Sequence, residues 1–421
     1  MRFYYLIVLL LLCTTANAAV ANACMLTGEV KGRNSKNLVL HKCSESSKTL
    51  YENPVLIPIE NGKFSYTFLY DATEAYELIF EDELEAGSWR PIVFFPDAQV
   101  TFVLHPEQEA NNNRVTGGIM NTEFTAYRSE ERSTFDPMFE KLDDIRQRLQ
   151  QEGVYETMEY ESVRQKLRVL KQDDYDARTP LYQQLAEMEK TRARYTDKSK
   201  LLVINRQDSL WRVRFSWKYA YMLRNPGLVS YYLLFNDATM EVKNNAHVAK
   251  LAMDIFPIFE KKFPQHPYTE KIRVQLAGIQ TIVVGRKYID FKAPTVAGDT
   301  VRLSTLINNK IALIDLWGSW CGPCIAKSRT VVPIYQKYKS KGFEVVGIAR
   351  EFKSTDAVKR RLAKEQFSWT NLVELDDHQN IWNQYGISNG AGLMVLVDRS
   401  GVILAIDPKP EELERILQEK L

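Results

Sequence analysis

The stretch ALIDLWGSWCGPC, residues 312–324, joins an unbroken apolar run to two cysteines three residues apart. The run Ile311 to Trp317 predicts a buried strand, and helical spacing follows from Cys324 to Lys339. A cysteine at such a strand-to-helix junction lies beside the free N–H groups of the first helical turn, which stabilise a thiolate. We therefore predict that Cys321 is a nucleophile with a lowered pKa and that Cys324 is the shielded cysteine that resolves a mixed disulfide.

A lone Cys-x-x-Cys can also be half of a zinc site or a structural disulfide. A structural zinc site needs four ligands, and no second Cys-x-x-Cys or Cys–His pair stands at ligand spacing. We expect no metal, and no cofactor other than the redox-active disulfide Cys321–Cys324.

Strands and helices alternate from about Gly285 onward, which indicates an α/β domain. The predicted elements after the first helix are a strand at 343–348, a helix at 356–366, a hairpin of 393–397 and 402–406 around the turn at 398–401, and a closing helix at 410–421.

Residues 312–324 resemble the active-site segment of thioredoxins, and more closely that of the exported thioredoxin-like reductases of Gram-negative envelopes, including those of cytochrome c maturation. Ala293-Pro294 and Val301 to Leu306 resemble their entry segment, so the likeness covers residues 285–421. It implies a thioredoxin-like fold, a disulfide-containing protein as substrate and a membrane or envelope reductant as partner. The upstream residues resemble, more weakly, an uncharacterised module that precedes such domains.

Asp315, six residues before Cys321, matches the buried acid that lies beneath the cysteine pair of thioredoxins. A carboxylate in apolar surroundings has a raised pKa and can take the proton from Cys324. The alternative is a partly exposed aspartate at a strand end. Trp320 and the spacer Gly322-Pro323 are expected to form substrate surface, although packing alone would also explain the tryptophan. A Gly-Pro spacer is that of reducing thioredoxins.

The sequence departs from the thioredoxin pattern at the edge where substrates dock. Thioredoxins place a cis-proline just before the strand opposite the cysteine pair, whereas Tyr385 to Asp398 contains no proline. Counting back from the predicted strand at 393–397 puts Ala391 and Gly392 there. A cis bond without proline costs about 2.5 to 4 kcal/mol, so we expect a trans peptide in a loop that glycine permits.

The 421 residues suggest two or three domains, and turn signals with alternating apolar residues predict a small antiparallel β-sandwich at 24–118. Asn61-Gly62 is a turn signal, and Phe64, Tyr66 and Phe68 follow it with period two. The number of strands expected is roughly six or seven.

Residues 119–284 change to a helical period, with one apolar face formed by Phe139, Leu142, Ile145 and Leu149. The breaks expected between its helices are Pro180, Asn225-Pro226-Gly227, and Pro264 with Pro267. The basic and aromatic stretch Trp211 to Lys218 is interpreted as a helix with its aromatic face in the core. Because 55 Lys and Arg nearly cancel 53 Asp and Glu, no nucleic-acid partner is expected.

Residues 1–23 are predicted to be a signal peptide that exports the chain to the periplasm or cell envelope. Arg2 precedes the apolar run Phe3 to Leu12, and the small triplets at 16–18 and 21–23 are candidate cleavage sites. The alternative, a membrane anchor, needs about 20 apolar residues, which this run lacks.

Cys24 and Cys43 remain beside the redox pair once Cys13 leaves with the signal peptide. Two strands joined by a turn near 32–35 would place Cys24 opposite Cys43, which predicts a structural disulfide. The alternatives are two unrelated thiols, or a lipid anchor on Cys24, although Ala21 stands where lipoprotein signals usually carry a large aliphatic residue.

Two other functions remain open. A thiol peroxidase would have antioxidant activity, but peroxiredoxins carry threonine or serine three residues before the reactive cysteine, and here Gly318 stands there. Alternatively the chain is an envelope binding or scaffold protein whose working part is 25–282 and whose thiols are secondary.

Overall fold

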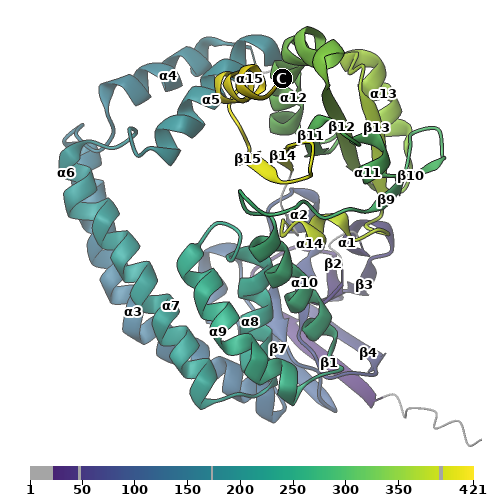
Figure 1. The fold of residues 1–421 in the computed structure, drawn as a ribbon. Helices are drawn as coiled ribbons and strands as arrows, with labels where there is room; N and C mark the ends of the chain where they lie inside the picture. Colours follow the sequence, from purple (N-terminus) through teal and green to yellow (C-terminus); the bar gives the residue numbers. More distant parts are fainter. Residues whose placement is uncertain (1–21, 46–48, 172–173, 388–391) are drawn as a thin grey trace, which may run out of the picture. The chain divides into compact units, whose positions relative to one another are not determined.

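The computed structural model describes residues 22–45, 49–171, 174–387 and 392–421 (Figure 1). Two compact units divide the chain: one reaches to Cys43 and includes Pro54–Thr122, and the other consists of Ser44–Asn53 and Glu123–Leu421. The predicted signal peptide lies outside the described residues except for its last two positions. Across the described ranges, no helix has the length and apolar character needed to cross a membrane.

The first unit contains two four-stranded sheets that share one apolar core. The first sheet runs β4 (Lys63–Tyr70), β1 (Asn22–Val30), β7 (Gln99–Leu104) and β8 (Arg114–Thr116), and the second runs β3 (Val55–Pro58), β2 (Asn37–Lys42), β5 (Tyr76–Phe80) and β6 (Ile92–Phe94). Leu26 and Phe102 from the first sheet and Leu38 and Phe94 from the second are buried in that core. The predicted sandwich is confirmed, but β1 and β7 pair in parallel, so the expectation of purely antiparallel pairing is wrong.

The Asn61-Gly62 turn has left-handed backbone at both residues, with φ of 50° and 73°. It connects β3 to β4, which lie in different sheets. Phe64 and Tyr70 are buried while the residues between them alternate in exposure, as period two requires. The turn is closed by an isolated antiparallel bridge between Glu60 and Lys63, and beyond this bridge the chain passes from one sheet to the other.

Cys24 and Cys43 are both free thiols. Cys24 lies in β1 opposite Phe68 of β4, whereas Cys43 directly follows β2 in the other sheet. The predicted disulfide is wrong because β1 and β2 do not pair with each other. Burial raises the pKa of the Cys24 thiol, which is fully enclosed in the core, and raises the pKa of Cys43 well above its ordinary value. A lipid chain on Cys24 would require that core to open.

Three short helical segments lie between these strands in the sequence: α2 (Glu81–Glu85) and the 3-10 turn η1 (Glu107–Asn112), which belong to the first unit, and α1 (Thr49–Glu52), which belongs to the second. The middle region is helical, as predicted. Its helices are α3 (Ile119–Gln151), α4 (Met158–Val169), α5 (Tyr175–Lys190), α6 (Asp197–Ser199), the π-helical turn η2 (Lys200–Ile204), α7 (Asn205–Arg224), α8 (Leu228–Met240), α9 (Ala246–Lys262) and α10 (Pro267–Thr281).

The predicted helix breaks are only partly right. Asn225 to Gly227 separates α7 from α8, and Pro267 begins α10. Pro180 lies inside α5 and does not end it. A proline this close to the helix start removes one backbone hydrogen bond, which the remaining turns of the helix tolerate.

The stretch Trp211 to Lys218 lies in α7 and packs into the helical region. The Trp211 ring lies 4.9 Å from that of Phe139 in α3. Lys218 Nζ donates to Asp237 Oδ1 at 2.6 Å, and Arg214 pairs with a buried glutamate of α3. The basic and aromatic residues of this stretch therefore contact other helices of the same region, and internal packing explains why they occur together.

The C-terminal sheet has five strands in the order β13-β12-β11-β14-β15 (Figure 1). Its strands are β11 (Ile311–Trp317), β12 (Phe343–Glu351), β13 (Thr370–Leu375), β14 (Leu393–Val397) and β15 (Ile403–Ile406). The first three are parallel to one another, β14 pairs antiparallel with β11, and β15 pairs antiparallel with β14 at the edge of the sheet. With the helix α12 between β11 and β12, this is the thioredoxin-like arrangement that was predicted.

The other elements of this domain are α12 (Gly322–Tyr338), η3 (Lys339–Lys341), α13 (Asp356–Glu365), α14 (Ile381–Gln384), α15 (Pro410–Lys420), and the small entry hairpin β9 (Lys292–Pro294) and β10 (Thr300–Arg302) with α11 (Leu303–Leu306). Every residue of β11 is buried. Its alternate side chains enter two apolar clusters, Leu313 and Trp317 on the α12 side and Ile314 and Leu316 on the opposite side. Strand β13 and helix α14 were not predicted.

Helix α10 meets the end of α14 within the second unit, backbone against backbone. A Cβ atom on Gly278 of α10 would lie 2.5 Å from the backbone nitrogen of Gly386, and Gln275 Nε2 donates to the Gly386 carbonyl oxygen at 3.1 Å. A side chain at position 278 is therefore incompatible with this contact.

Candidate active site

Cys321 and Cys324 form a disulfide at the start of α12, with their Cα atoms 5.3 Å apart. Cys321 is the N-cap residue, and its Sγ accepts a hydrogen bond from the Cys324 backbone N–H at 3.2 Å. Pro323 lies in the first turn, where its fixed φ suits a helix and its missing N–H has no partner to lose. Helix geometry thus directs a backbone donor at the sulfur of Cys321, which favours its thiolate after reduction.

Exposure does not separate the roles of the two cysteines in the disulfide form, because 3% of Cys321 and 8% of Cys324 is accessible. The distinction rests on position: Cys321 receives the helix N–H, and Cys324 lies inside the first turn.

Asp315 lies in β11 between Gly347 of β12 and Met394 of β14. Alternation along the strand turns its side chain to the α12 side, and only 2% of the residue is accessible. Ser328 Oγ of α12 donates to Asp315 Oδ2 at 2.6 Å. Burial raises the pKa of Asp315 to about 7, although the Ser328 hydrogen bond favours the ionised form. An acid in this range can exchange a proton near neutral pH.

Two charged groups outside β11 also act on Asp315. Lys327 lowers the pKa of Asp315 and Asp407 raises it, while the two pair with each other at 3.0 Å. Asp407 also accepts a hydrogen bond from the backbone N–H of Met394 at 3.0 Å. The pair is partly solvent-exposed, which weakens the effect of each charge on the buried acid, and the two charges act on its pKa in opposite directions.

Glu351, at the end of β12, fixes the loop that leads into the cysteine pair. Its two carboxylate oxygens accept from the backbone N–H of Ser319 at 2.8 Å and from the Ser319 hydroxyl at 2.7 Å. Only 2% of Glu351 is accessible, and burial raises its pKa. Sequence reasoning missed both Glu351 and Ser328. The sequence signal that could have identified Ser328 is its position one helical turn after Cys324. The only signal for Glu351 is that a polar residue stands at the end of a mostly apolar strand.

The predicted substrate-surface residues Trp320, Gly322 and Pro323 are all exposed. Half of Trp320 is accessible, and its indole N–H donates to the carbonyl oxygen of Arg350 at 3.0 Å. Its ring stacks on that of Phe352 at 6.3 Å. The tryptophan therefore has a fixed orientation beside the disulfide while one part of it faces solvent.

Gly392 lies directly against the disulfide. A Cβ atom there would be 2.2 Å from the carbonyl oxygen of Leu316 and 3.0 Å from Cys324 Sγ. Only glycine fits this approach. Ala391 lies outside the described residues, so the geometry of the peptide before Gly392 stays a prediction.

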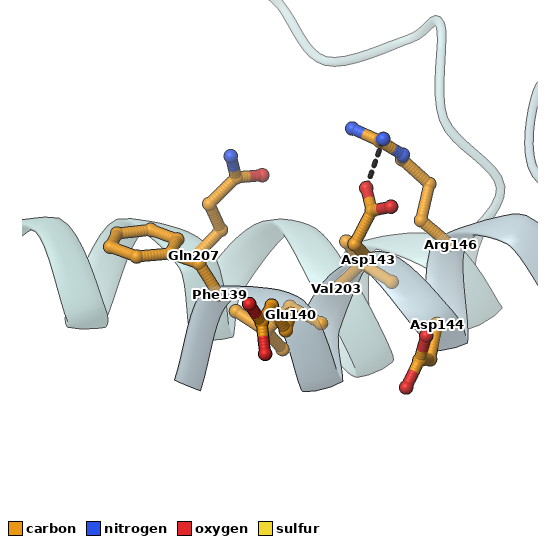
Figure 2. A pocket seen from close by; sticks show the side chains of 8 residues that line it. Phe139, Glu140, Asp143, Asp144, Arg146, Val203 and Gln207 are labelled. Carbon is orange, nitrogen blue, oxygen red and sulfur yellow. Dashed lines mark ion pairs between the residues drawn. The ribbon is translucent and has the colours of Figure 1, made fainter. Parts of the chain in front are cut away.

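A separate surface hollow of about 390 Å³ lies in the helical region (Figure 2). Its lining consists of Phe139, Glu140, Leu142, Asp143, Asp144, Arg146, Val203 and Gln207. Asp143 and Arg146 pair with each other. None of the lining residues belongs to the disulfide site. Within the described ranges, no group of three or more His, Cys, Asp or Glu residues is arranged to hold a metal ion.

The C-terminal domain is the part of the chain that is similar to known proteins. A family model described as AhpC/TSA family matches residues 284–406. The thiol-disulfide oxidoreductase ResA of Bacillus anthracis is 27% identical over 121 residues, which cover 29% of this chain and 67% of that protein. The thiol:disulfide interchange protein DsbE of Pseudomonas fluorescens biotype C is 28% identical over 127 residues, covering 30% of this chain and 67% of the relative.

Among solved structures, a putative thiol:disulfide interchange protein DsbE from Chlorobium tepidum is 29% identical, with a TM-score of 0.29, and the match covers 33% of this chain and 95% of that one. The C-terminal domain of a putative thiol-disulfide oxidoreductase from Bacteroides thetaiotaomicron is 23% identical, with a TM-score of 0.30, covering 33% of this chain and 97% of the other.

The matched residues contain both the disulfide at the start of α12 and the sheet on which it is built. Relatives named for thiol-disulfide exchange share this region. The C-terminal domain is therefore similar, in sequence and in the placement of its disulfide, to the thioredoxin-like thiol-disulfide oxidoreductases.

Proposed function

We propose that this protein reduces disulfides in other proteins outside the cytoplasm, in the periplasm or cell envelope. The observation that carries the proposal is the Cys321–Cys324 disulfide at a helix start with the buried acid Asp315 on the same side of β11. The Gly-Pro spacer favours the reducing direction, and the apolar segment at 3–12 favours export.

In the reducing direction, the Cys321 thiolate attacks one sulfur of a substrate disulfide and releases the other as a thiolate. Cys324 then attacks the Cys321 sulfur, which re-forms the enzyme disulfide and releases the reduced substrate. Two electrons pass from the enzyme to the substrate in each cycle. A dithiol reductant of the membrane or envelope must return them, because an oxidising compartment keeps the pair oxidised.

Trp320 and Gly392 border the disulfide and are the surfaces proposed to receive the substrate. Trp320 offers an exposed apolar ring. Gly392 lets the backbone before β14 come close to Cys324 Sγ, so a substrate segment that docks along this edge would lie directly beside the disulfide. These two features suit an unfolded or flexible protein segment more than a small thiol.

The test is insulin disulfide reduction by the full-length protein with dithiothreitol as donor. We expect a rate well above that of dithiothreitol alone, lost in Cys321→Ser and kept in Cys43→Ser, which changes a half-buried thiol of the other unit. Cys324→Ser should accumulate mixed disulfides, and their mass spectrometric identification would name the substrates. A rate equal to that of dithiothreitol would favour a binding or scaffold role, and turnover of hydrogen peroxide without insulin reduction would favour a thiol peroxidase.

A further inference from the structure

Ser328 places a buried hydroxyl within hydrogen-bond distance of both the acid and the backbone carbonyl of the second cysteine. It lies on α12 one turn after Cys324, and none of its surface is accessible. Its Oγ is 2.6 Å from Asp315 Oδ2 and 3.1 Å from the carbonyl oxygen of Cys324. Both distances are within hydrogen-bond range, yet a hydroxyl has a single hydrogen to donate.

The arrangement suits both protonation states of Asp315. When Asp315 is ionised, the Ser328 hydroxyl donates to the carboxylate. When Asp315 carries a proton, the carboxyl O–H can donate to Ser328 Oγ, and the hydroxyl can turn its hydrogen to the Cys324 carbonyl oxygen. The hydrogen bond between Asp315 Oδ2 and Ser328 Oγ then persists in both protonation states without movement of a heavy atom.

We propose that Ser328 is a positioning residue whose rotating hydroxyl keeps Asp315 hydrogen-bonded before and after it takes the proton of Cys324. The inference rests on the proposed disulfide reduction. In the resolving step, the Cys324 S–H bond breaks and its proton goes to the Asp315 carboxylate. The Cys324 thiolate forms a bond to Cys321 Sγ, and the electron pair of the broken mixed disulfide leaves on the substrate sulfur.

Other charged groups near Asp315 stay in place when Ser328 is changed. Lys327 from α12 and Asp407, which follows β15, both act on Asp315 and pair with each other. Loss of Ser328 removes a hydrogen bond from both forms of Asp315, but the ionised form loses more, because a hydrogen bond to a charged carboxylate is stronger than one between neutral groups. Asp315 should then become a poorer proton acceptor at neutral pH, and the resolving step should move to higher pH.

The test follows the reduced full-length protein with the chromogenic disulfide DTNB between pH 5 and 9. The first thionitrobenzoate released reports attack by Cys321, and the second reports resolution by Cys324. In Ser328→Ala we expect the second phase to slow about tenfold at pH 7 and its midpoint to rise by about one pH unit, with the first phase unchanged. Ser230→Ala, a buried serine of α8, is the control and should leave both phases unchanged.

Ser328→Thr and Ser328→Val form a matched pair of nearly equal size that differ in the hydroxyl. The threonine variant should keep the profile of the unchanged protein, and the valine variant should shift as alanine does. In an Asp315→Asn background, Ser328→Ala should slow the second phase no further. An unshifted second phase in both Ala and Val variants, or an equal slowing in the Asp315→Asn background, would overturn the inference. Failure of the unchanged protein to reduce insulin while both DTNB phases are normal would instead count against the proposed function.

Discussion

Asp315→Asn should stabilise the protein, and by an amount that depends on pH. The ordinary pKa of an aspartate, 3.8, applies to the unfolded chain, whereas burial raises the pKa of Asp315 to about 7 in the folded protein. The folded state therefore holds the proton more tightly. Below about pH 4 both states are protonated, and Asp315 costs the fold no ionisation energy. As the pH rises, the unfolded state ionises first, and stability is lost until the pH passes about 7.

The size of this loss follows from the two pKa values. They lie about three pH units apart, and each unit corresponds to about 1.4 kcal/mol, so Asp315 costs the fold at most ~4 kcal/mol above pH 7. An asparagine keeps the shape and an oxygen that can accept from Ser328, and it carries no charge to desolvate. The gain in the free energy of unfolding should therefore grow from near zero at pH 4 to a few kcal/mol at pH 8.

Hydrogen exchange of the β11 amides in the oxidised full-length protein measures this gain, because these central amides exchange only when the domain opens. Glu374→Gln is the matched control: Glu374 is fully buried in β13, and burial raises its pKa to about 7 as well. Both variants should gain protection with rising pH, but only Asp315→Asn should slow the resolving step. A gain from Asp315→Asn that is the same at pH 4 and pH 8 would refute the reasoning, because it would mean that the folded protein does not hold this proton.

Three further outcomes can be checked on the same protein. Iodoacetamide at pH 7 should label Cys321 of the reduced protein before Cys324, because the helix N–H favours its thiolate; peptide mapping that finds Cys324 labelled first would reverse the assignment. Glu351→Ala should lower the free energy of unfolding by about 1–3 kcal/mol, because the buried N–H of Ser319 loses its acceptor, and urea unfolding at an unaltered value would show that another acceptor replaces it. Gly392→Ala should destabilise the domain by about 1–3 kcal/mol, because the new Cβ would lie 2.2 Å from a backbone oxygen of β11; a thermal midpoint like that of the unchanged protein would mean that the loop moves freely aside.

The sequence predicted the redox domain well because its signals are local. A fully apolar run, two cysteines and a following helical period lie within a few turns of chain, and β11 and α12 appear where they were expected. Strand β13 was missed because polar residues interrupt its apolar pattern. The structure buries them with partners: Asn371 accepts from the Trp317 indole N–H at 3.2 Å, and Glu374 accepts from the backbone N–H of Gln379 at 2.8 Å.

The wrong predictions concern contacts between residues far apart in the sequence, which were inferred from local sequence patterns. The turn near 32–35 suggested that the strands on either side pair, but they join different sheets, which separates Cys24 from Cys43. Ser328 and Glu351 illustrate the same limit at the site. Each is one of several polar residues in its element, and only tertiary packing determines that one meets Asp315 and the other Ser319.

The glycine contact between α10 and α14 bears on how the second unit loses its structure. Because Gly278 and Gly386 let two backbones touch, no side chain separates α10 from the end of α14 at this contact. Separating them would also break the hydrogen bond from Gln275 to the Gly386 carbonyl. We therefore expect the helical region and the redox domain to unfold together. A fragment that begins near residue 285 would expose to solvent the surface around Gly386 that α10 covers. The boundary near residue 285 separates a helical sequence pattern from an α/β pattern, but the contact between Gly278 and Gly386 joins the two regions in the folded protein.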